Sequence, residues 1–189
     1  MEEIELVKRV KQGEQNAFDE LYEKYKVVTL RMAYLICGNL ADSEDIVQET
    51  FVKCYQHIGE LKKEEGFRSW LFHILTRTAW KYCKKQSKEC PEEDIMEKMS
   101  VQKEASSLEI ILDKEQHSHL LSKINELNVK HRTTIILYYY NGLSTKEIAK
   151  IVGCLEGTVK SRLFVARRLL KESIVSDEKE EGVLHERWI

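Results

Sequence analysis

A single proline, Pro91, stands among the 189 residues of the chain, together with only eight glycines. Proline and glycine are the residues that most disfavour a helix interior, so their scarcity leaves long stretches able to stay helical. Apolar residues recur every three to four positions through most of these stretches, which is the period of an amphipathic helix. The sequence therefore predicts an all-α protein.

The composition is that of a globular chain, with 42% hydrophobic and 33% charged residues, which excludes global disorder. No apolar run approaches the roughly 20 residues that span a bilayer, and the acidic start, Glu2 and Glu3, is unlike a signal peptide. We therefore expect a cytoplasmic protein without direct membrane insertion. The five cysteines are scattered, contain no CxxC pair and are interpreted as reduced thiols that pack as small apolar side chains.

Charge is segregated along the chain although the net charge is only −2. Residues 61–90 carry eight basic and three acidic side chains, and residues 116–172 carry ten and four. Two cationic blocks predict two surfaces for a polyanion. The acidic stretch between them has weak periodicity and is interpreted as a linker. We predict two small helical domains at 1–90 and 116–175, joined by an acidic linker at 91–115 and followed by a tail at 176–189.

The first cationic block predicts a helix that carries its basic side chains on one face. At about 100° per residue, Leu71, Leu75 and Thr78 share a core-facing stripe, and the basic residues lie about 120° away. Because this stripe carries only positive charge, it forms no stabilising i,i+4 ion pairs and is instead able to bind a phosphate backbone. The neighbouring aromatic rings either stack on unpaired bases or belong to the core. The candidates for contact with nucleic acid are Phe67, Trp70, His73, Arg77, Lys81 and Lys84.

An acidic helix precedes this block. Asp42 or Ser43 is expected to cap it, with carboxylates near the positive end of the helix dipole. Asp45, Gln48 and Glu49 point away from its predicted core face. Carboxylates and an amide on a rigid helix suit docking onto a basic protein surface, and the alternative is that they are capping and solubility charges.

The second cationic block carries a helix-turn-helix pattern. Ser144 and Glu147 form a capping box, Gly153 supplies a turn, and a second helix begins near Glu156. The second helix of such a motif enters the major groove of DNA, where basic side chains reach guanine edges or phosphates. The candidates on its exposed faces are Lys160, Ser161, Phe164, Arg167 and Arg168.

Taken together, these segments resemble the bacterial sigma-70 family of RNA polymerase sigma factors, in its extracytoplasmic-function (ECF) group. Residues 42–51 are similar to region 2.2, which docks on the β′ clamp helices of RNA polymerase. Residues 67–74 are similar to regions 2.3 and 2.4, which melt and read the promoter −10 element. Residues 147–149 and 157–163 are similar to region 4.2, which reads the −35 element.

The resemblance implies roles for these residues. Asp45, Gln48 and Glu49 would bind polymerase, residues 61–67 would form a loop that captures a flipped base, and Arg162 would join the −35 readers in a phosphate or packing role. The implied function is promoter recognition and transcription initiation for a stress- or signal-responsive regulon. The implied partners are core RNA polymerase through its β′ clamp and β flap, promoter DNA and a membrane-anchored anti-sigma factor.

Two other classes of protein are alternatives. A stand-alone helix-turn-helix regulator would explain residues 116–172 and leave the first cationic block without a role. An enzyme is disfavoured because no phosphate loop, nucleophile–base pair or metal-ligand cluster is visible. Asp113, His117 and His119 come nearest to a metal set, yet they lie at a predicted exposed helix start. No cofactor and no metal site are therefore expected.

Overall fold

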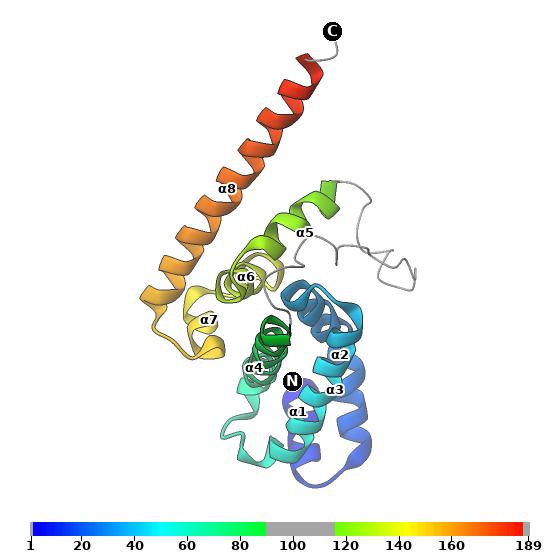
Figure 1. The fold of residues 1–189 in the computed structure, drawn as a ribbon. Helices are drawn as coiled ribbons and strands as arrows, with labels where there is room; N and C mark the ends of the chain where they lie inside the picture. Colours follow the sequence, from blue (N-terminus) through cyan, green and yellow to red (C-terminus); the bar gives the residue numbers. More distant parts are fainter. Residues whose placement is uncertain (1, 90–115, 187–189) are drawn as a thin grey trace.

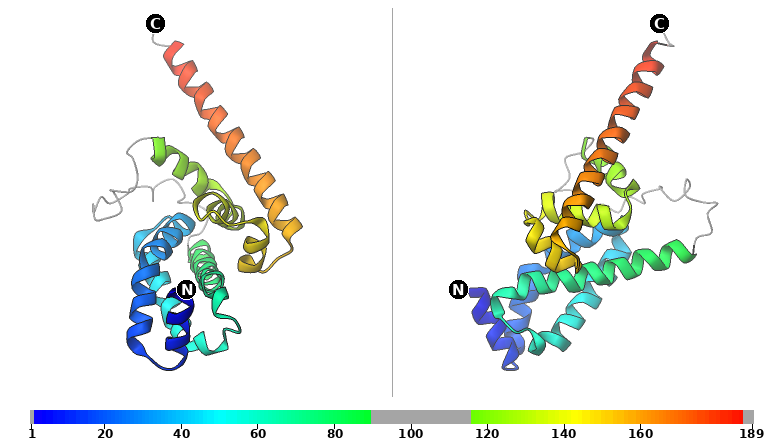
Figure 2. Two further views of the ribbon diagram at one scale, coloured as in Figure 1. Left: turned by 180° about the vertical axis from the view of Figure 1, so that it is seen from behind. Right: turned by 90° about the vertical axis from the view of Figure 1, so that its left-hand side faces the viewer.

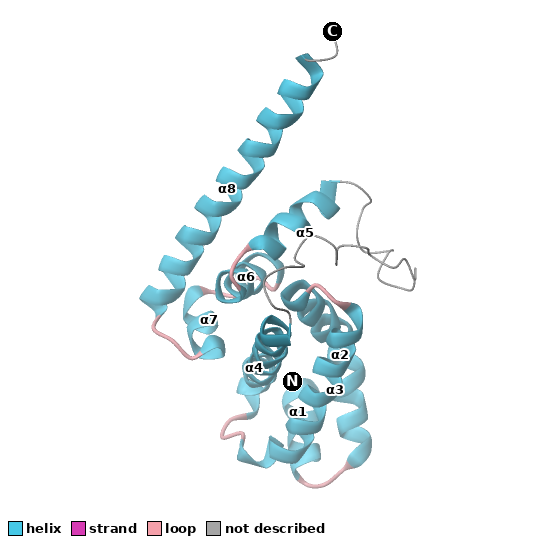
Figure 3. Cartoon of the chain, in the orientation of Figure 1, coloured by secondary structure: helices cyan, strands magenta, loops and turns pink. Residues whose placement is uncertain are grey.

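A computed structural model describes the backbone of residues 2–89 and 116–186, with side chains over residues 3–85 and 120–175. Within these residues the chain forms helices joined by short loops, and no strand occurs in them (Figure 3). The predicted all-α class is confirmed. The predicted linker at 91–115 lies outside the described residues.

The first group of helices forms one lobe, in which α2 packs against α1, α3 and α4 (Figure 1). The core of this lobe is closed by aromatic contacts, because the Tyr25 ring meets Phe67 and Phe72 edge to face at 5.6 and 6.5 Å between ring centroids. The elements of this lobe are α1 (Glu2–Lys11), α2 (Gln15–Cys37), α3 (Leu40–His57), the 3-10 turns η1 (Ile58–Glu60) and η2 (Glu64–Gly66), and α4 (Phe67–Glu89).

The second lobe is built around the start of α8, which packs against α6 and α7 and is also touched by α5. The elements of this lobe are α5 (Gln116–Glu126), α6 (Val129–Ile135), the π-helical segment η4 (Ile136–Tyr140), α7 (Thr145–Val152) and α8 (Glu156–Glu186). The helix α8 then continues well beyond the lobe, as Figure 1 shows. The predicted tail boundary at residue 175 therefore falls inside a helix.

The cap of α3 differs from the prediction. The helix begins at Leu40 and Asn39 is its N-cap, with its side-chain oxygen accepting a hydrogen bond from the Asp42 backbone N–H at 3.0 Å. Asp42 therefore lies in the first turn, and Ser43 is buried. The prediction was wrong because Asn39 and Asp42 are both good N-cap residues. The left-handed turn at Gly38, with φ of +74°, ends α2 directly before Asn39, so Asn39 takes the cap position.

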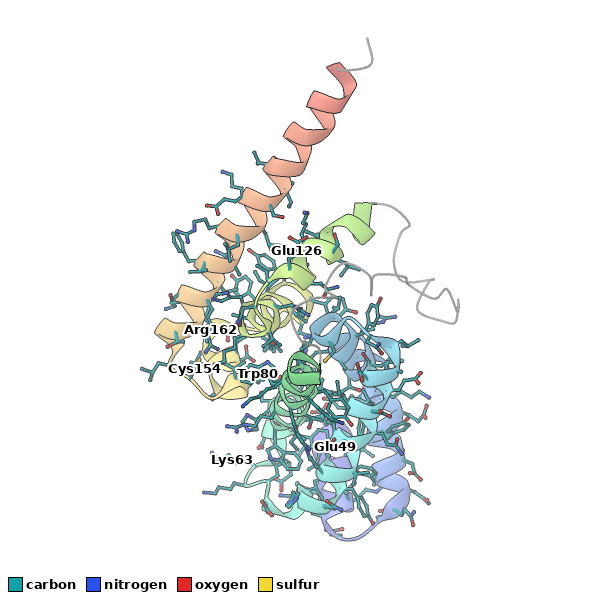
Figure 4. All side chains as sticks on the ribbon, in the orientation of Figure 1. Glu49, Lys63, Trp80, Glu126, Cys154 and Arg162 are labelled. Atoms are coloured by element: carbon teal, nitrogen blue, oxygen red, sulfur yellow. The ribbon has the colours of Figure 1, made fainter. Side chains whose placement is uncertain are left out.

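The two lobes pack against each other through α4. This helix crosses beneath the second lobe and contacts α7 and α6 (Figure 2). The Trp80 indole N–H donates to the Thr133 hydroxyl at 2.9 Å, and Figure 4 shows Trp80 at this junction. The Arg132 guanidinium of α6 donates to the Ile36 carbonyl at 2.7 Å. We call these contacts, with His73 to Ile151 described below, the seam. None of the helices described here has both the length and the apolar character needed to cross a membrane.

Candidate functional site

The outward face of α3 is anionic, as predicted. Asp45 and Gln48 are exposed, whereas Ile46, Val47 and the other residues of the opposite stripe are buried. Glu49 is half-buried, and its Oε1 atom forms an ion pair with the Lys53 ammonium at 2.7 Å. The ammonium of Lys81 on α4 lies 3.6 Å from the same oxygen. The hydrogen bond from Lys53 lowers the pKa of Glu49, so its carboxylate stays ionised at neutral pH. Glu49 therefore connects the anionic face of α3 to the cationic face of α4 (Figure 4).

Beside this face lies an apolar groove between α2 and α3, with a volume of about 840 Å³. Val27, Val52 and Tyr55 on its walls are 48%, 50% and 53% exposed, a large apolar exposure for one surface. These residues are not among the candidates predicted from the sequence. The signal that marks them is apolar side chains outside the core stripe, as at Val52 and Tyr55, three residues apart on one helix face.

The division of α4 into two faces is confirmed. Leu71, Leu75 and Thr78 are buried, and Arg77, Lys81 and Lys84 are exposed. A cationic face therefore does lie on the surface of this helix. The part that these side chains play in binding DNA stays a prediction.

The aromatic end of α4 differs from the expected surface. Phe67 has no exposed area and packs in the core against Tyr25, so its ring is not available for stacking on a base. We therefore correct the candidate set by removing Phe67. Helical spacing already pointed to the core, because Phe67 lies four residues before Leu71 and falls on the same core-facing stripe. Trp70 is half-buried beside it, with ring centroids 6.3 Å apart.

His73 also has a different environment from that expected for a DNA contact. Its Nδ1 lies 2.6 Å from the backbone carbonyl oxygen of Ile151, the penultimate residue of α7. At that separation the Nδ1–H tautomer donates to the carbonyl. His73 therefore belongs to the seam in this conformation and faces the helix-turn-helix motif.

The segment before α4 is held by one lysine. The Lys11 ammonium donates to the Leu61 carbonyl at 2.6 Å and pairs with the Glu64 carboxylate at 2.7 Å. Lys62 and Lys63 are exposed on this segment. Lys11 therefore anchors the loop that the resemblance assigns to base capture at Leu61 and at Glu64. The two lysines between these anchor points face solvent.

The helix-turn-helix motif is confirmed as a structure. Ser144 and Glu147 form the reciprocal capping box of α7, and Gly153 ends that helix with a left-handed φ of +69°. The Ser144 hydrogen bonds lower the pKa of Glu147 and keep the cap charged. A cap of this kind contributes about 1 kcal/mol to stability. The second helix, α8, then begins at Glu156, as predicted.

The outer surface of α8 presents most of the predicted −35 candidates. Phe164 is 67% exposed, and the Lys160 ammonium lies 2.9 Å from the Glu156 carboxylate. The Arg167 guanidinium lies 5.5 Å from the ring centroids of both Tyr138 and Tyr139, which holds it at the surface by cation–π contact. Ser161 and Arg168 are also exposed.

Arg162 lies off this surface, as expected. It is half-buried, and its Nη1 atom is enclosed without a hydrogen-bond partner (Figure 4). This position favours the packing role over the phosphate role.

A second apolar groove, of about 530 Å³, lies between α5, η4 and α8. Its wall is formed by Leu120, Ile124, Tyr139, Leu170 and Ile174, with Tyr139 60% exposed. No sequence motif marked it, because its residues come from three separate elements. The predicted absence of a metal site involved Asp113, His117 and His119, whose side chains lie outside the described residues.

Comparisons with known proteins agree with this arrangement. The Sigma-70 region 2 family matches residues 21–89, and the Sigma-70, region 4 family matches residues 119–170. The ECF RNA polymerase sigma-E factor of Haemophilus influenzae is 34% identical over 179 residues, covering 89% of this chain and 93% of that protein. The sigma-E factor of Escherichia coli K12 is also 34% identical, covering 89% and 92%.

Two solved structures share the fold. The sigma factor RpoE of Bartonella quintana, determined in complex with the anti-sigma factor NepR, has 25% identity and a TM-score of 0.68 over 85% of this chain and 98% of that one. CnrH, determined in complex with the cytosolic domain of CnrY, has 21% identity and a TM-score of 0.71 over 94% and 99%. The chain belongs to the sigma-70 family, in its ECF group, whose members are transcription initiation factors rather than enzymes.

Proposed function

We propose that this sigma factor binds core RNA polymerase through α3, reads the −10 element with α4 and the −35 element with α8, and thereby starts transcription of a signal-responsive set of genes in the cytoplasm. The observation that carries the proposal is the placement of an anionic face on α3 directly beside a cationic face on α4, with a second cationic face on α8. A stand-alone regulator would leave the first two faces without a use.

The polymerase contact is proposed to combine Asp45, Gln48 and Glu49 with the adjoining α2–α3 groove. The carboxylates supply orientation and repel DNA, and the exposed apolar walls supply the buried area that a stable interface needs. The β′ clamp is the proposed occupant. For the β flap, the apolar groove between α5, η4 and α8 offers a second attachment point.

The −10 contact is proposed to use Trp70, Arg77, Lys81 and Lys84 on α4, together with the loop that Lys11 anchors. Cations along one helix face follow a phosphate backbone, and a half-buried indole can offer one ring face to an unpaired base. Unstacking a base costs a few kcal/mol, which stacking and loop contacts would offset.

The −35 contact is proposed to use Lys160, Ser161, Phe164, Arg167 and Arg168. Their exposure on the second helix of a helix-turn-helix places them to enter a major groove, with Phe164 able to contact a thymine methyl group. Arg162 is proposed to support this helix from the inside.

An anti-sigma factor is a further proposed partner. The sigma factor of Bartonella quintana is bound by such a protein, and both apolar grooves of this chain offer surfaces that it would block. We propose that the partner is anchored in the membrane and releases the chain in response to a signal.

The test of the function is transcription in vitro. Core RNA polymerase with the purified chain is expected to yield specific transcripts from a promoter library, whereas core polymerase alone is expected to yield none. The chain without polymerase should not select any duplex strongly. Tight dimeric binding to a palindromic duplex without polymerase would instead identify a stand-alone regulator and refute the proposal.

The seam implies a change of shape on the promoter. Elements named −10 and −35 are about 25 base pairs apart, or about 85 Å of duplex at 3.4 Å per pair. In this structure α4 packs directly against α7, and the His73 side chain bonds to the Ile151 backbone. We propose that one chain does not reach both elements in this packed state, and that the lobes separate when the protein joins polymerase on a promoter.

Fluorescence energy transfer between dyes at Glu5 and Lys130, introduced as unnatural amino acids, can measure this separation. We expect high transfer in the free protein and a clear fall on addition of core polymerase. Arg132→Ala should lower transfer in the free protein, because it removes the hydrogen bond to the Ile36 carbonyl. Lys24→Ala, on an exposed face away from the seam, serves as the control. Equal transfer in free and polymerase-bound protein would refute the separation.

A further inference from the structure

Two cysteines that are far apart in sequence meet between α2 and α4. The Sγ atoms of Cys37 and Cys83 are 3.2 Å apart, although the residues are 46 positions apart in the chain. A disulfide bond is about 2.05 Å long, so the sulfurs need to approach by only about 1 Å to join. Both side chains are partly exposed, which leaves a path for a small oxidant.

The surroundings of the pair favour a thiolate. The Arg132 guanidinium is fixed nearby by its hydrogen bond to the carbonyl of Ile36, the residue next to Cys37. The hydrogen bond between the two thiols and the positive charge of Arg132 lower the pKa of Cys83. The same hydrogen bond raises the pKa of Cys37. Asp42 and burial oppose the thiolate at Cys83, but the hydrogen bond is the larger effect.

The geometry points to a peroxide-oxidised thiol pair, which we propose forms an intramolecular disulfide between Cys37 and Cys83. The Cys83 thiolate attacks one oxygen of a peroxide, the O–O bond breaks, and Cys83 becomes a sulfenic acid. The Cys37 thiol then attacks that sulfur, the S–S bond forms and water leaves. In total, two thiols and one hydrogen peroxide give one disulfide and two water molecules, and two electrons pass from sulfur to oxygen.

The other described cysteines lack this arrangement. Cys54 is buried, and burial raises the pKa of its thiol to about 12, which suppresses the thiolate. Cys154 makes a sulfur contact of 3.6 Å to the Leu155 carbonyl, with no second thiol recorded beside it in the described residues. These two residues are therefore internal controls. The interpretation of the cysteines as reduced thiols that only pack as small apolar side chains is therefore replaced, for Cys37 and Cys83 alone, by the proposed redox role.

The disulfide would tie together two helices with different proposed duties. The helix α2 lines the proposed polymerase groove, and α4 carries the proposed −10 face. A covalent link between residues 46 positions apart restricts the unfolded chain and stabilises the folded one. Oxidation would therefore fix α4 against α2 and raise the melting temperature by about 5–10 °C.

The test treats the full chain with one equivalent of hydrogen peroxide and maps the peptides without reduction. We expect an intact-mass loss of two hydrogens, one linked peptide pair joining Cys37 to Cys83, and reversal by dithiothreitol. A melting temperature that rises on oxidation and falls on reduction is the second expected result. Five free thiols after treatment, links through other cysteines, or dimers between chains would each overturn the proposal.

Variants test whether the disulfide needs both members of the pair. In Cys37→Ala and in Cys83→Ala, dimedone is expected to trap a sulfenic acid at the remaining thiol of the pair, since the second thiol is missing, and no intramolecular disulfide should form. Cys154→Ser should behave as the wild type. Circular dichroism checks that each variant is folded, and peptide mapping of the unmodified chain decides the outcome even where a variant unfolds. An intramolecular disulfide in either variant would show that another cysteine forms the bond and would refute the proposal.

Discussion

Asp45→Lys combined with Glu49→Lys is expected to weaken binding to core RNA polymerase by at least about 100-fold. The two carboxylates are proposed to meet basic side chains of the β′ clamp, and reversal turns attraction into repulsion. Loss of one partner in a close charge pair costs about 2–5 kcal/mol, and each 1.4 kcal/mol is a factor of ten in the dissociation constant. Biolayer interferometry with immobilised core polymerase measures the change.

The single change Asp45→Lys separates binding from stability. Glu49 pairs with Lys53 and lies near Lys81, so its reversal also brings three cations together, whereas Asp45 is exposed. Asp45→Lys alone should lose at least tenfold in affinity at an unchanged melting temperature. A double reversal at Glu5 and Glu20, with the same change in net charge, should leave polymerase binding intact. Undiminished affinity of the Asp45 and Glu49 double variant would remove α3 from the interface.

Lys160→Ala combined with Arg167→Ala is expected to reduce promoter-specific transcription about 10- to 100-fold while leaving the contact of α3 with the β′ clamp unchanged. Each base or phosphate contact of this kind contributes about 1–3 kcal/mol. Both residues lie on the exposed surface of α8, on a different lobe from the proposed β′ contact. Runoff transcription at a fixed, saturating sigma concentration measures the loss, and the salt dependence of promoter binding should become less steep.

The matched control for this variant is Lys24→Ala with Lys130→Ala, which removes the same charge from exposed positions on α2 and α6. It should transcribe as the wild type does. Because Arg167 packs over Tyr138 and Tyr139, the melting temperature of the α8 variant must also be compared with the wild type. If binding to the β′ clamp fell together with transcription, the proposed separation of duties between the lobes would be wrong.

Much of the local structure follows from the sequence because it depends on neighbours within one or two helical turns. The buried stripe of α4, the Ser144–Glu147 capping box and the Gly153 turn were all predicted from spacing and residue type. The errors are also local. Asn39 competed with Asp42 as a cap, and Phe67 lies four residues before Leu71, so that its spacing already placed the ring on the buried stripe.

The candidate surfaces were predictable where one helix carries them, as for the anionic face of α3 and the cationic faces of α4 and α8. They were not predictable where several helices contribute. The two apolar grooves combine residues from α2 with α3, and from α5 and η4 with α8. Exposed Val52 and Tyr139 looked like ordinary apolar residues until the fold placed other apolar walls beside them.

The helical class, the order of the two motifs and the faces of individual helices all follow from the order of residues, because helical periodicity is a property of consecutive residues. The packing of whole helices, in contrast, brings His73 to Ile151, Trp80 to Thr133 and Cys37 to Cys83. Each of these contacts joins residues at least 46 positions apart. Such pairs are set by how whole helices pack, and no short-range pattern in the chain encodes that packing.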